Sequence, residues 1–126
     1  GDNISPSRVE EKLNIEPEIA QSMLYGDFKN YLVAIIVPDK DEATAWANKN
    51  NKSKDLNLLI EDKDFVKMIK DVVSKANAKL SVTEQIKKFI LIDEEFTIEN
   101  DMMTPTMKVK RYKVKSIFGD KLEKLY

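Results

Sequence analysis

Residues Tyr31–Pro38, which read YLVAIIVP, decide the fold of this chain of 126 residues. The first seven are apolar and rich in β-branched side chains, which is typical of a central strand covered on both faces. Before them, Glu18–Tyr25 (EIAQSMLY) shows a weaker alternation of period two, which predicts a second strand. Because only the turn Gly26–Asn30 separates the two runs, we expect an antiparallel hairpin.

The segments outside this hairpin carry mostly helical patterns. Ser5 can cap a helix that begins at Pro6 and places Val9 and Leu13 on its inner side. Further along the chain, the patterns predict a helix at Lys40–Asn50, a surface loop at Asn48–Asn57, a long helix from Asp62 to Leu80, a capping box at Ser81–Glu84, a third buried strand at Phe89–Ile92 and a helical tail at Tyr112–Tyr126. In the tail, one helical face is expected to hold Val114, Ile117, Phe118, Leu122 and Leu125. The predicted fold class is α+β: a small three-stranded sheet, made of the N-terminal antiparallel hairpin and a later strand, packed with helices.

Composition narrows the classes of function. The chain has no cysteine and no histidine, which removes thiolate chemistry, the commonest general base and most metal sites. Its three glycines lie too far apart for a phosphate-binding loop, so a complete nucleotide-using enzyme would be hard to build. A net charge of −1 argues against a broad nucleic-acid surface. Length fits one domain, and the absence of cysteine suits a cytoplasmic protein. We interpret the chain as part of a larger enzyme.

The stretch Thr104–Arg111 (TPTMKVKR) is the most informative for function. Pro105 restricts its own φ and disfavours the helical region for Thr104, so the loop approaches Lys108 in a restricted shape. A lysine placed there is a compact positive charge suited to a phosphate or a developing anion. With 34% charged residues, however, an isolated lysine is most often a solvated surface residue.

Three blocks of the sequence resemble one family in the same order along the chain. The run Glu95–Arg111 is similar to the last motif of long-chain acyl-CoA synthetases, which are adenylate-forming ligases. The block Gly1–Glu10 (GDNISPSRVE) looks like the family's glycine-x-x-isoleucine-x-proline-x-x-valine-glutamate motif, and Tyr25–Pro38 looks like its central hairpin. Two positions depart from the pattern: Met107 stands where many members have glycine, and Asp101 replaces a glycine that is usual in the long-chain branch.

The resemblance implies that residues 1–126 form one C-terminal lid domain of a long-chain fatty acid–CoA ligase. The large N-terminal adenylation domain of the same polypeptide would be absent from this chain. The whole enzyme would make an acyl-adenylate from fatty acid and ATP with Mg²⁺, and would then transfer the acyl group to coenzyme A. ATP and Mg²⁺ would be bound mainly by the N-terminal domain, so the isolated chain is expected to be inactive and to hold no metal. A peripheral association of the full enzyme with a membrane stays open.

Specific residues follow from the same resemblance. Lys108 would be the catalytic lysine that contacts carboxylate and phosphate during adenylation. In a second pose of the rotating domain, Gly1, Asn3 and Ile4 would line the tunnel for coenzyme A. Lys110 and Lys113, in the basic run that follows Lys108, are further candidates to attract the phosphorylated end of coenzyme A.

Two other classes of function stay open at this point. A stand-alone interaction domain predicts an apolar surface patch unrelated to Lys108. A small nucleic-acid-binding module would use the basic segment 108–115 with Tyr112 for stacking, and predicts salt-dependent affinity for oligonucleotides. The balanced net charge argues against the second class.

Overall fold

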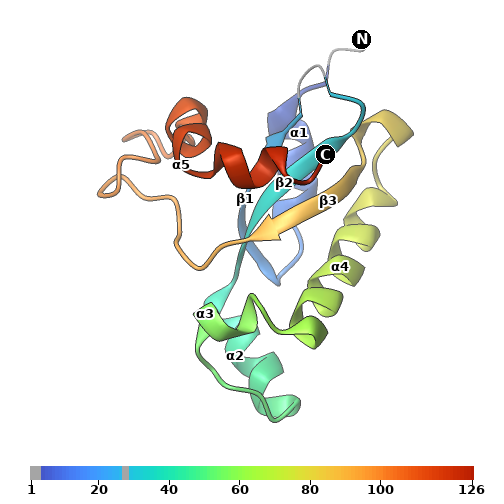
Figure 1. Cartoon of the computed structure of the whole chain (residues 1–126), viewed down its shortest axis with the longest axis vertical. Coiled ribbons are helices and arrows are strands. Elements are labelled where there is room, and N and C mark those ends of the chain that lie inside the picture. The colour runs from blue at the N-terminus through green and yellow to red at the C-terminus, as the bar shows by residue number, and fades with distance from the viewer. Residues whose placement is uncertain (1–3, 27–28) are drawn as a thin grey trace.

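A computed structural model describes residues 4–26 and 29–126 of the chain. Within them lies a three-stranded sheet of order β1-β2-β3, formed by β1 (Ile19–Tyr25), β2 (Leu32–Pro38) and β3 (Ile86–Leu91). Helices cover both faces of this sheet, so the predicted α+β class is confirmed (Figure 1). The turn predicted at Gly26–Asn30 includes residues 27 and 28, which lie outside the described residues.

The central strand β2 pairs with both neighbours. Its pairing with β1 is antiparallel, which confirms the predicted hairpin, with one irregularity between Ile19 and Gln21. Its pairing with β3 is parallel, so the chain must cross from one end of the sheet to the other between them. That crossover contains α2 (Lys40–Lys49), α3 (Leu56–Leu59) and α4 (Lys63–Asn77). Of these helices, α3 was not predicted from the sequence.

All seven residues of β2 are buried, as expected for a strand covered on both faces. Successive side chains enter opposite hydrophobic cores because strand side chains alternate in direction. The first core takes Leu32, Ala34 and Ile36, and the second takes Val33, Ile35 and Val37. One short stretch of sequence therefore contributes to both halves of the interior.

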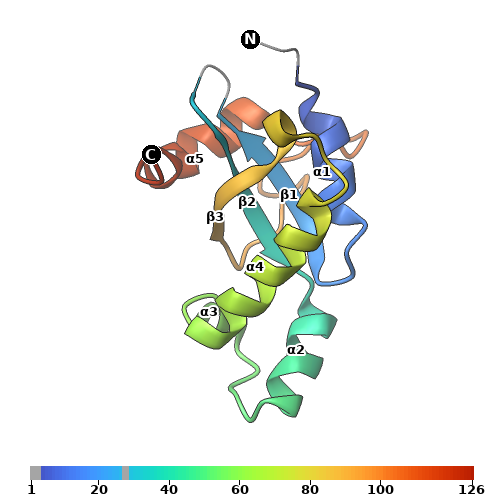
Figure 2. The same ribbon diagram turned by 90° about the vertical axis from the view of Figure 1, so that its right-hand side faces the viewer.

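The first core lies between the sheet and the helices α1 (Pro6–Asn14), α2, α3 and α4. Val9 and Leu13 of α1 are fully buried there, as the sequence predicted. The long helix α4 buries its predicted stripe, which consists of Phe65, Ile69, Val72, Val73 and Ala76. Figure 2 shows α4 running across this face of the sheet, with α1 beside β1.

The second core lies on the other face, under α5 (Arg111–Glu123) and the irregular segment that precedes it. Val114 and Leu122 of α5 are fully buried, and Phe118 and Leu125 pack against this core. The prediction that Ile117 shares this face is wrong, because Ile117 is 48% exposed. It lies about 100° around the helix from Phe118, which turns it toward solvent.

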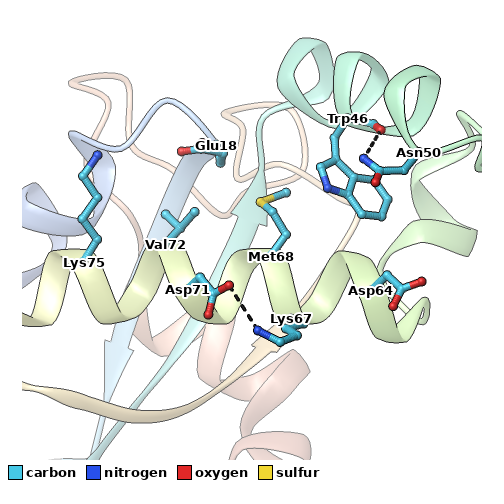
Figure 3. A pocket seen from close by; sticks show the side chains of 9 residues that line it. All are labelled: Glu18, Trp46, Asn50, Asp64, Lys67, Met68, Asp71, Val72 and Lys75. Atoms are coloured by element: carbon cyan, nitrogen blue, oxygen red, sulfur yellow. Dashed lines mark hydrogen bonds and ion pairs between the residues drawn. The ribbon is translucent and has the colours of Figure 1, made fainter.

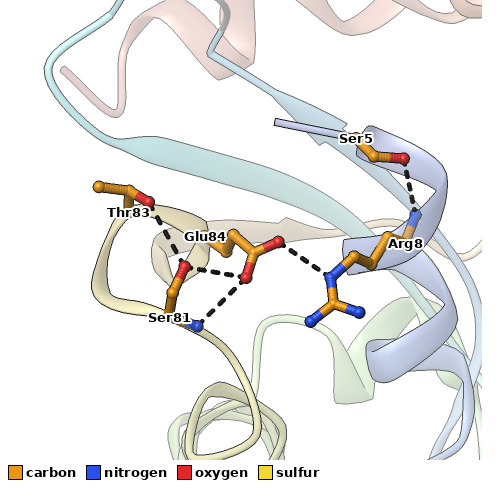
Figure 4. Close-up of polar contacts among 5 residues, drawn as sticks. All are labelled: Ser5, Arg8, Ser81, Thr83 and Glu84. Carbon is orange, nitrogen blue, oxygen red and sulfur yellow. Dashed lines mark hydrogen bonds and ion pairs between the residues drawn. The ribbon is translucent and has the colours of Figure 1, made fainter. Parts of the chain in front are cut away.

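The predicted capping box at Ser81–Glu84 is present and begins a 3₁₀ turn at Val82–Glu84 (Figure 4). The Glu84 carboxylate accepts hydrogen bonds from the N–H and the hydroxyl of Ser81, and Arg8 Nε donates to it at 3.1 Å. These donors, with the Ser81 hydroxyl contributing most, hold the pKa of Glu84 below its usual value. The turn is therefore tied to α1.

Gly26 directly follows β1 and has a backbone conformation that requires glycine. Its φ is +129°, and a Cβ added there would lie 2.5 Å from the Tyr126 hydroxyl oxygen and 2.9 Å from the Tyr31 carbonyl oxygen. The Tyr126 hydroxyl and the Tyr31 carbonyl occupy this space, and the hydroxyl donates a hydrogen bond to the carbonyl at 2.8 Å. Burial raises the pKa of Tyr126 to about 12. The end of the hairpin is thus fastened to the residues that follow α5.

Candidate functional site

Lys108 lies on a tight loop between β3 and α5 whose two arms are joined by backbone hydrogen bonds. Met103 and Val109 form an antiparallel bridge, and the Thr104 N–H donates to the Lys108 carbonyl at 2.8 Å. Within the loop, the Lys108 N–H donates to Thr104 Oγ1 at 3.1 Å. This loop (residues 103–109) extends beside the sheet on the side away from α4 (Figure 1).

The two departures from the family pattern fall at unusual backbone conformations. Met107 and Asp101 both have a φ of +65°, in the left-handed region that glycine occupies without steric cost. The N–H of Met107 donates to the Thr104 carbonyl at 2.8 Å and closes the turn in this conformation. The loop therefore keeps a shape suited to glycine while two other residues occupy these positions.

The irregular segment before the Lys108 loop is held by side-chain amides. Gln21 of β1 donates from Nε2 to the Phe96 carbonyl at 2.9 Å and accepts from the Phe96 N–H at 2.7 Å. Asn100 accepts from the N–H groups of Thr97 and Met102 and donates to the Glu95 carbonyl. Because Phe96 and Met102 are also buried in the second core, the base of the loop is fixed on the sheet.

Among the described residues, Lys108 is exposed and its ammonium group makes no ion pair or side-chain hydrogen bond. The neighbouring cations differ. Lys110 forms an ion pair with Asp101, and this pair, with a smaller contribution from Lys113, holds the pKa of Asp101 below its usual value. The same pair raises the pKa of Lys110. Lys108 is thus available to an external anion, whereas Lys110 already has a partner.

Arg111, the first residue of α5, reaches across the molecule to α1. Its Nη1 and Nη2 atoms donate to Glu10 Oε2 and Oε1 at 2.6 and 2.7 Å. Sequence reasoning missed this pair, because 101 residues separate its members and no local pattern connects them. A signal was present, since Glu10 and Arg111 end the first and the last of the family-like blocks.

The other predicted site residues do not gather around Lys108. Gly1 and Asn3 lie outside the described residues. Ile4 packs against the first core, with α1 and α4, so part of its side chain is structural. Lys113, in the first turn of α5, is half-buried. The assignments of Gly1, Asn3, Ile4, Lys110 and Lys113 to coenzyme A stay predictions.

A shallow hollow lies elsewhere, between α2 and α4 (Figure 3). Trp46, Met68 and Val72 form its apolar floor, and charged residues such as Lys67 and Asp71 form its rim. It belongs to the face of the sheet opposite the Lys108 loop, and none of the sequence-predicted site residues lines it. No acidic cluster that could hold a metal ion, and no helix able to cross a membrane, occurs in the part of the chain that the structure describes.

The chemistry available at the loop is that of a single exposed ammonium group on a restrained backbone. With no histidine or cysteine in the chain, this group has neither of those residues beside it as base or nucleophile. It can supply positive charge to reactants that another part of a protein holds. The small sheet, its helices and this loop fit what the sequence resemblance implies, a C-terminal domain of an adenylate-forming enzyme.

The chain belongs to the family described as the AMP-binding enzyme C-terminal domain, whose model matches residues 1–126. It is 34% identical over 128 residues to the long-chain-fatty-acid–CoA ligase FadD15 of Mycobacterium tuberculosis, covering 100% of this chain and 21% of that protein. It is 33% identical to the human long-chain-fatty-acid–CoA ligase 1, of which it covers 18%. The chain therefore spans about a fifth of the length of these curated relatives.

Solved structures support the same membership. The adenylation domain of the carboxylate reductase from Mycobacterium chelonae superposes with a TM-score of 0.81 at 26% identity, covering 100% of this chain and 18% of that one. The corresponding domain from Segniliparus rugosus, solved with AMP and a carboxylic acid, gives a TM-score of 0.79 at 28% identity. It too is matched over 100% of this chain and 18% of its own length.

Proposed function

We propose that the chain is the C-terminal domain of an ATP-dependent long-chain fatty acid–CoA ligase in which Lys108 supplies positive charge for adenylation. The observation that carries the proposal is the exposed Lys108 ammonium group on a loop whose base is fixed on the sheet through Gln21 and the second core. Membership of the AMP-binding family and the similarity to two proteins named as long-chain-fatty-acid–CoA ligases support the choice of reaction. A cytoplasmic location is part of the proposal.

The proposed chemistry explains why a lysine is needed. A fatty-acid carboxylate oxygen attacks the α-phosphorus of ATP and pyrophosphate leaves, so two anions must approach each other. An ammonium group aimed at this point reduces their repulsion and stabilises the charge that develops in the transition state. The N-terminal adenylation domain of the same polypeptide would hold ATP, Mg²⁺ and the fatty acid. In the second step the thiol of coenzyme A attacks the acyl carbon, and AMP leaves.

The two steps call for two poses of the domain. In the first pose Lys108 enters the active site. In the second pose the domain has turned, and the surface at Gly1, Asn3 and Ile4 faces the path of coenzyme A. Lys110 and Lys113 would attract the phosphorylated end of coenzyme A, although Lys110 must first exchange its partner Asp101. This requirement makes Lys113 the better placed of the two.

Lys108→Ala in the full-length enzyme should selectively damage adenylation. Loss of one electrostatic donor should lower the rate of acyl-adenylate formation on the order of 10²-fold or more. Thioester formation from a supplied acyl-adenylate should be largely spared, because Lys108 acts only in the first pose. Stability should barely change, since an exposed loop side chain has little packing to lose. The measurement is the rate of each half-reaction in mutant and parent.

A matched control is Lys54→Ala, which removes an exposed lysine from the segment between α2 and α3. This segment lies at the end of the molecule away from the Lys108 loop (Figure 1). The control should keep both half-reactions. Equal damage by Lys108→Ala to both half-reactions, or damage to neither, would show that Lys108 is not the adenylation lysine.

Neither alternative class gains a specific observation. A nucleic-acid module would need the charge of segment 108–115 to be free, but Asp101 and Glu10 partly neutralise it through Lys110 and Arg111. An interaction domain would need an apolar surface patch, whereas the hollow between α2 and α4 has a small apolar floor of Trp46, Met68 and Val72 enclosed by charged residues. The ligase domain is therefore the function proposed.

A further inference from the structure

The pair formed by Glu10 and Arg111 has the features of a rigid anchor. Both outer nitrogens of the guanidinium group bond to the two oxygens of one carboxylate, at 2.6 and 2.7 Å. This two-point contact fixes orientation as well as distance, which a single contact from a lysine cannot do. The Glu10 side chain is only 10% exposed, so water competes weakly for its oxygens.

The carboxylate of Glu10 is itself held by the sheet. Its Oε2 atom accepts a hydrogen bond from the Leu24 N–H at 2.7 Å, in β1 at the edge of the sheet. Glu10 therefore joins three parts of the fold: α1 that carries it, β1 through Leu24, and the first residue of α5 through Arg111. An anchor with this many attachments cannot shift without disturbing the sheet.

The anchor lies close to Lys108 along the chain. Arg111 follows Lys108 by three positions along the chain, a length that spans at most about 10 Å. The start of α5 has no side-chain cap of its own, because its N-cap residue is Lys110 and makes no such bond. Backbone bonds close the Lys108 loop on itself, whereas the Arg111 contact fixes the end of the loop relative to α1 and the sheet.

We propose that Glu10 and Arg111 are positioning residues for adenylation, which hold the Lys108 loop at a fixed angle to the rest of the domain. The proposal rests on the function proposed above for Lys108. A misplacement of about 1 Å at a reacting centre can cost as much as 10²-fold in rate. Because the pair with Glu10 keeps the loop fixed relative to α1 and the sheet, the Lys108 ammonium group would reach the same position each time the whole domain rotates.

The first test is Arg111→Lys in the full-length enzyme. This change keeps a positive charge beside the buried carboxylate but loses the two-point contact. We expect the kcat of adenylation to fall by about 10- to 100-fold while the KM values for ATP and fatty acid stay nearly constant. Thioester formation from supplied acyl-adenylate should be unchanged. Glu10→Gln, which keeps an acceptor oxygen for Leu24, should act in the same direction and serves if the first variant fails to fold.

A matched control separates positioning from the loss of any ion pair on α1. Arg8 lies on the same helix and donates to Glu84 at 3.1 Å (Figure 4). Among the described residues, it has no hydrogen bond or ion pair with the Lys108 loop. Arg8→Lys should therefore keep the kcat of adenylation. A loss in this control equal to that of Arg111→Lys would overturn the proposal, since any weakening of α1 would then suffice.

The decisive measurement is a double-mutant cycle with Lys108. If Arg111 acts by placing Lys108, then Arg111→Lys should cost nothing further once Lys108 is alanine. A full additional loss in the Lys108→Ala background would overturn the positioning role while leaving the function of Lys108 intact. If Lys108→Ala itself keeps normal adenylation, the proposed function fails first, and that result is distinguishable because it does not involve Arg111.

Discussion

Met107 carries a side chain in a backbone conformation that suits glycine. Its φ of +65° costs a residue with a Cβ roughly 1 kcal/mol or more. Met107→Gly should relieve this strain and raise the free energy of unfolding, with a net gain below about 1 kcal/mol because glycine also gains freedom in the unfolded chain. The urea midpoint of the 126-residue chain measures the change.

Met107→Ala is the matched control for that prediction. Alanine removes the side chain, which is 66% exposed, but keeps the Cβ that causes the strain. Its urea midpoint should stay near that of the parent. If the alanine and glycine variants were equally stabilised, the gain would come from removing an exposed apolar side chain and not from the backbone.

The candidate lysine, Lys108, could be singled out from the sequence once the family resemblance was added to the local pattern, whereas the residues that support its loop could not. Pro105, and the arginine three positions after Lys108, indicated this loop from the sequence. The hydrogen bonds of Gln21 and Asn100 that hold the segment before the loop, and the pair of Glu10 with Arg111, were missed. These polar residues look like surface residues in a chain with 34% charge, and their roles depend on partners brought together only by the fold.

The secondary-structure elements were predicted well where the pattern was strong. β2 and α4 have a continuous apolar run and a regular apolar stripe, and both lie within one to three residues of the expected bounds. The short helix α3 was missed because its four residues, LNLL, are too few to show a helical period. β3 begins at Ile86, three residues before its predicted start. The prediction missed these residues because Lys87 and Lys88 are exposed and interrupt the apolar pattern.

The contact between the β1–β2 hairpin and the residues after α5 should depend on alkaline pH. Tyrosine in an unfolded chain loses its proton near pH 10, whereas burial raises the pKa of Tyr126 to about 12. Between these values the folded state holds the proton more tightly than the unfolded state. The free energy of unfolding should therefore fall as pH rises from about 10 to about 12.

Tyr126→Phe tests this contact by removing the ionisable hydroxyl and its bond to the Tyr31 carbonyl. Below about pH 10 the parent should be more stable than the variant. Its advantage should shrink and disappear toward about pH 12, where the parent must bury a charged oxygen or release it. Urea midpoints of both proteins across this range supply the measurement. A constant difference at every pH would rule out Tyr126 as the titrating group.

The whole chain should fold alone and yet fail to catalyse. Two hydrophobic cores close around the sheet within the described residues, which predicts a cooperative thermal transition. The three glycines of the chain provide no phosphate-binding loop. Incubation with fatty acid, ATP, Mg²⁺ and coenzyme A should give no acyl-CoA above background, with the full-length enzyme as positive control. Robust turnover by the chain alone would contradict the proposal that it is a lid domain.

The position of β2 between two cores has a consequence for how the domain comes apart. Each core takes alternate residues of this one strand, so neither can lose its share of β2 without exposing the other to water. The two cores are thus coupled through β2. Unfolding the part of the chain around one core releases little conformational entropy unless the part around the other core unfolds as well. The proposed rotation of the domain as a rigid body would benefit from this cooperativity, because motion at its boundary would not be absorbed by internal loosening.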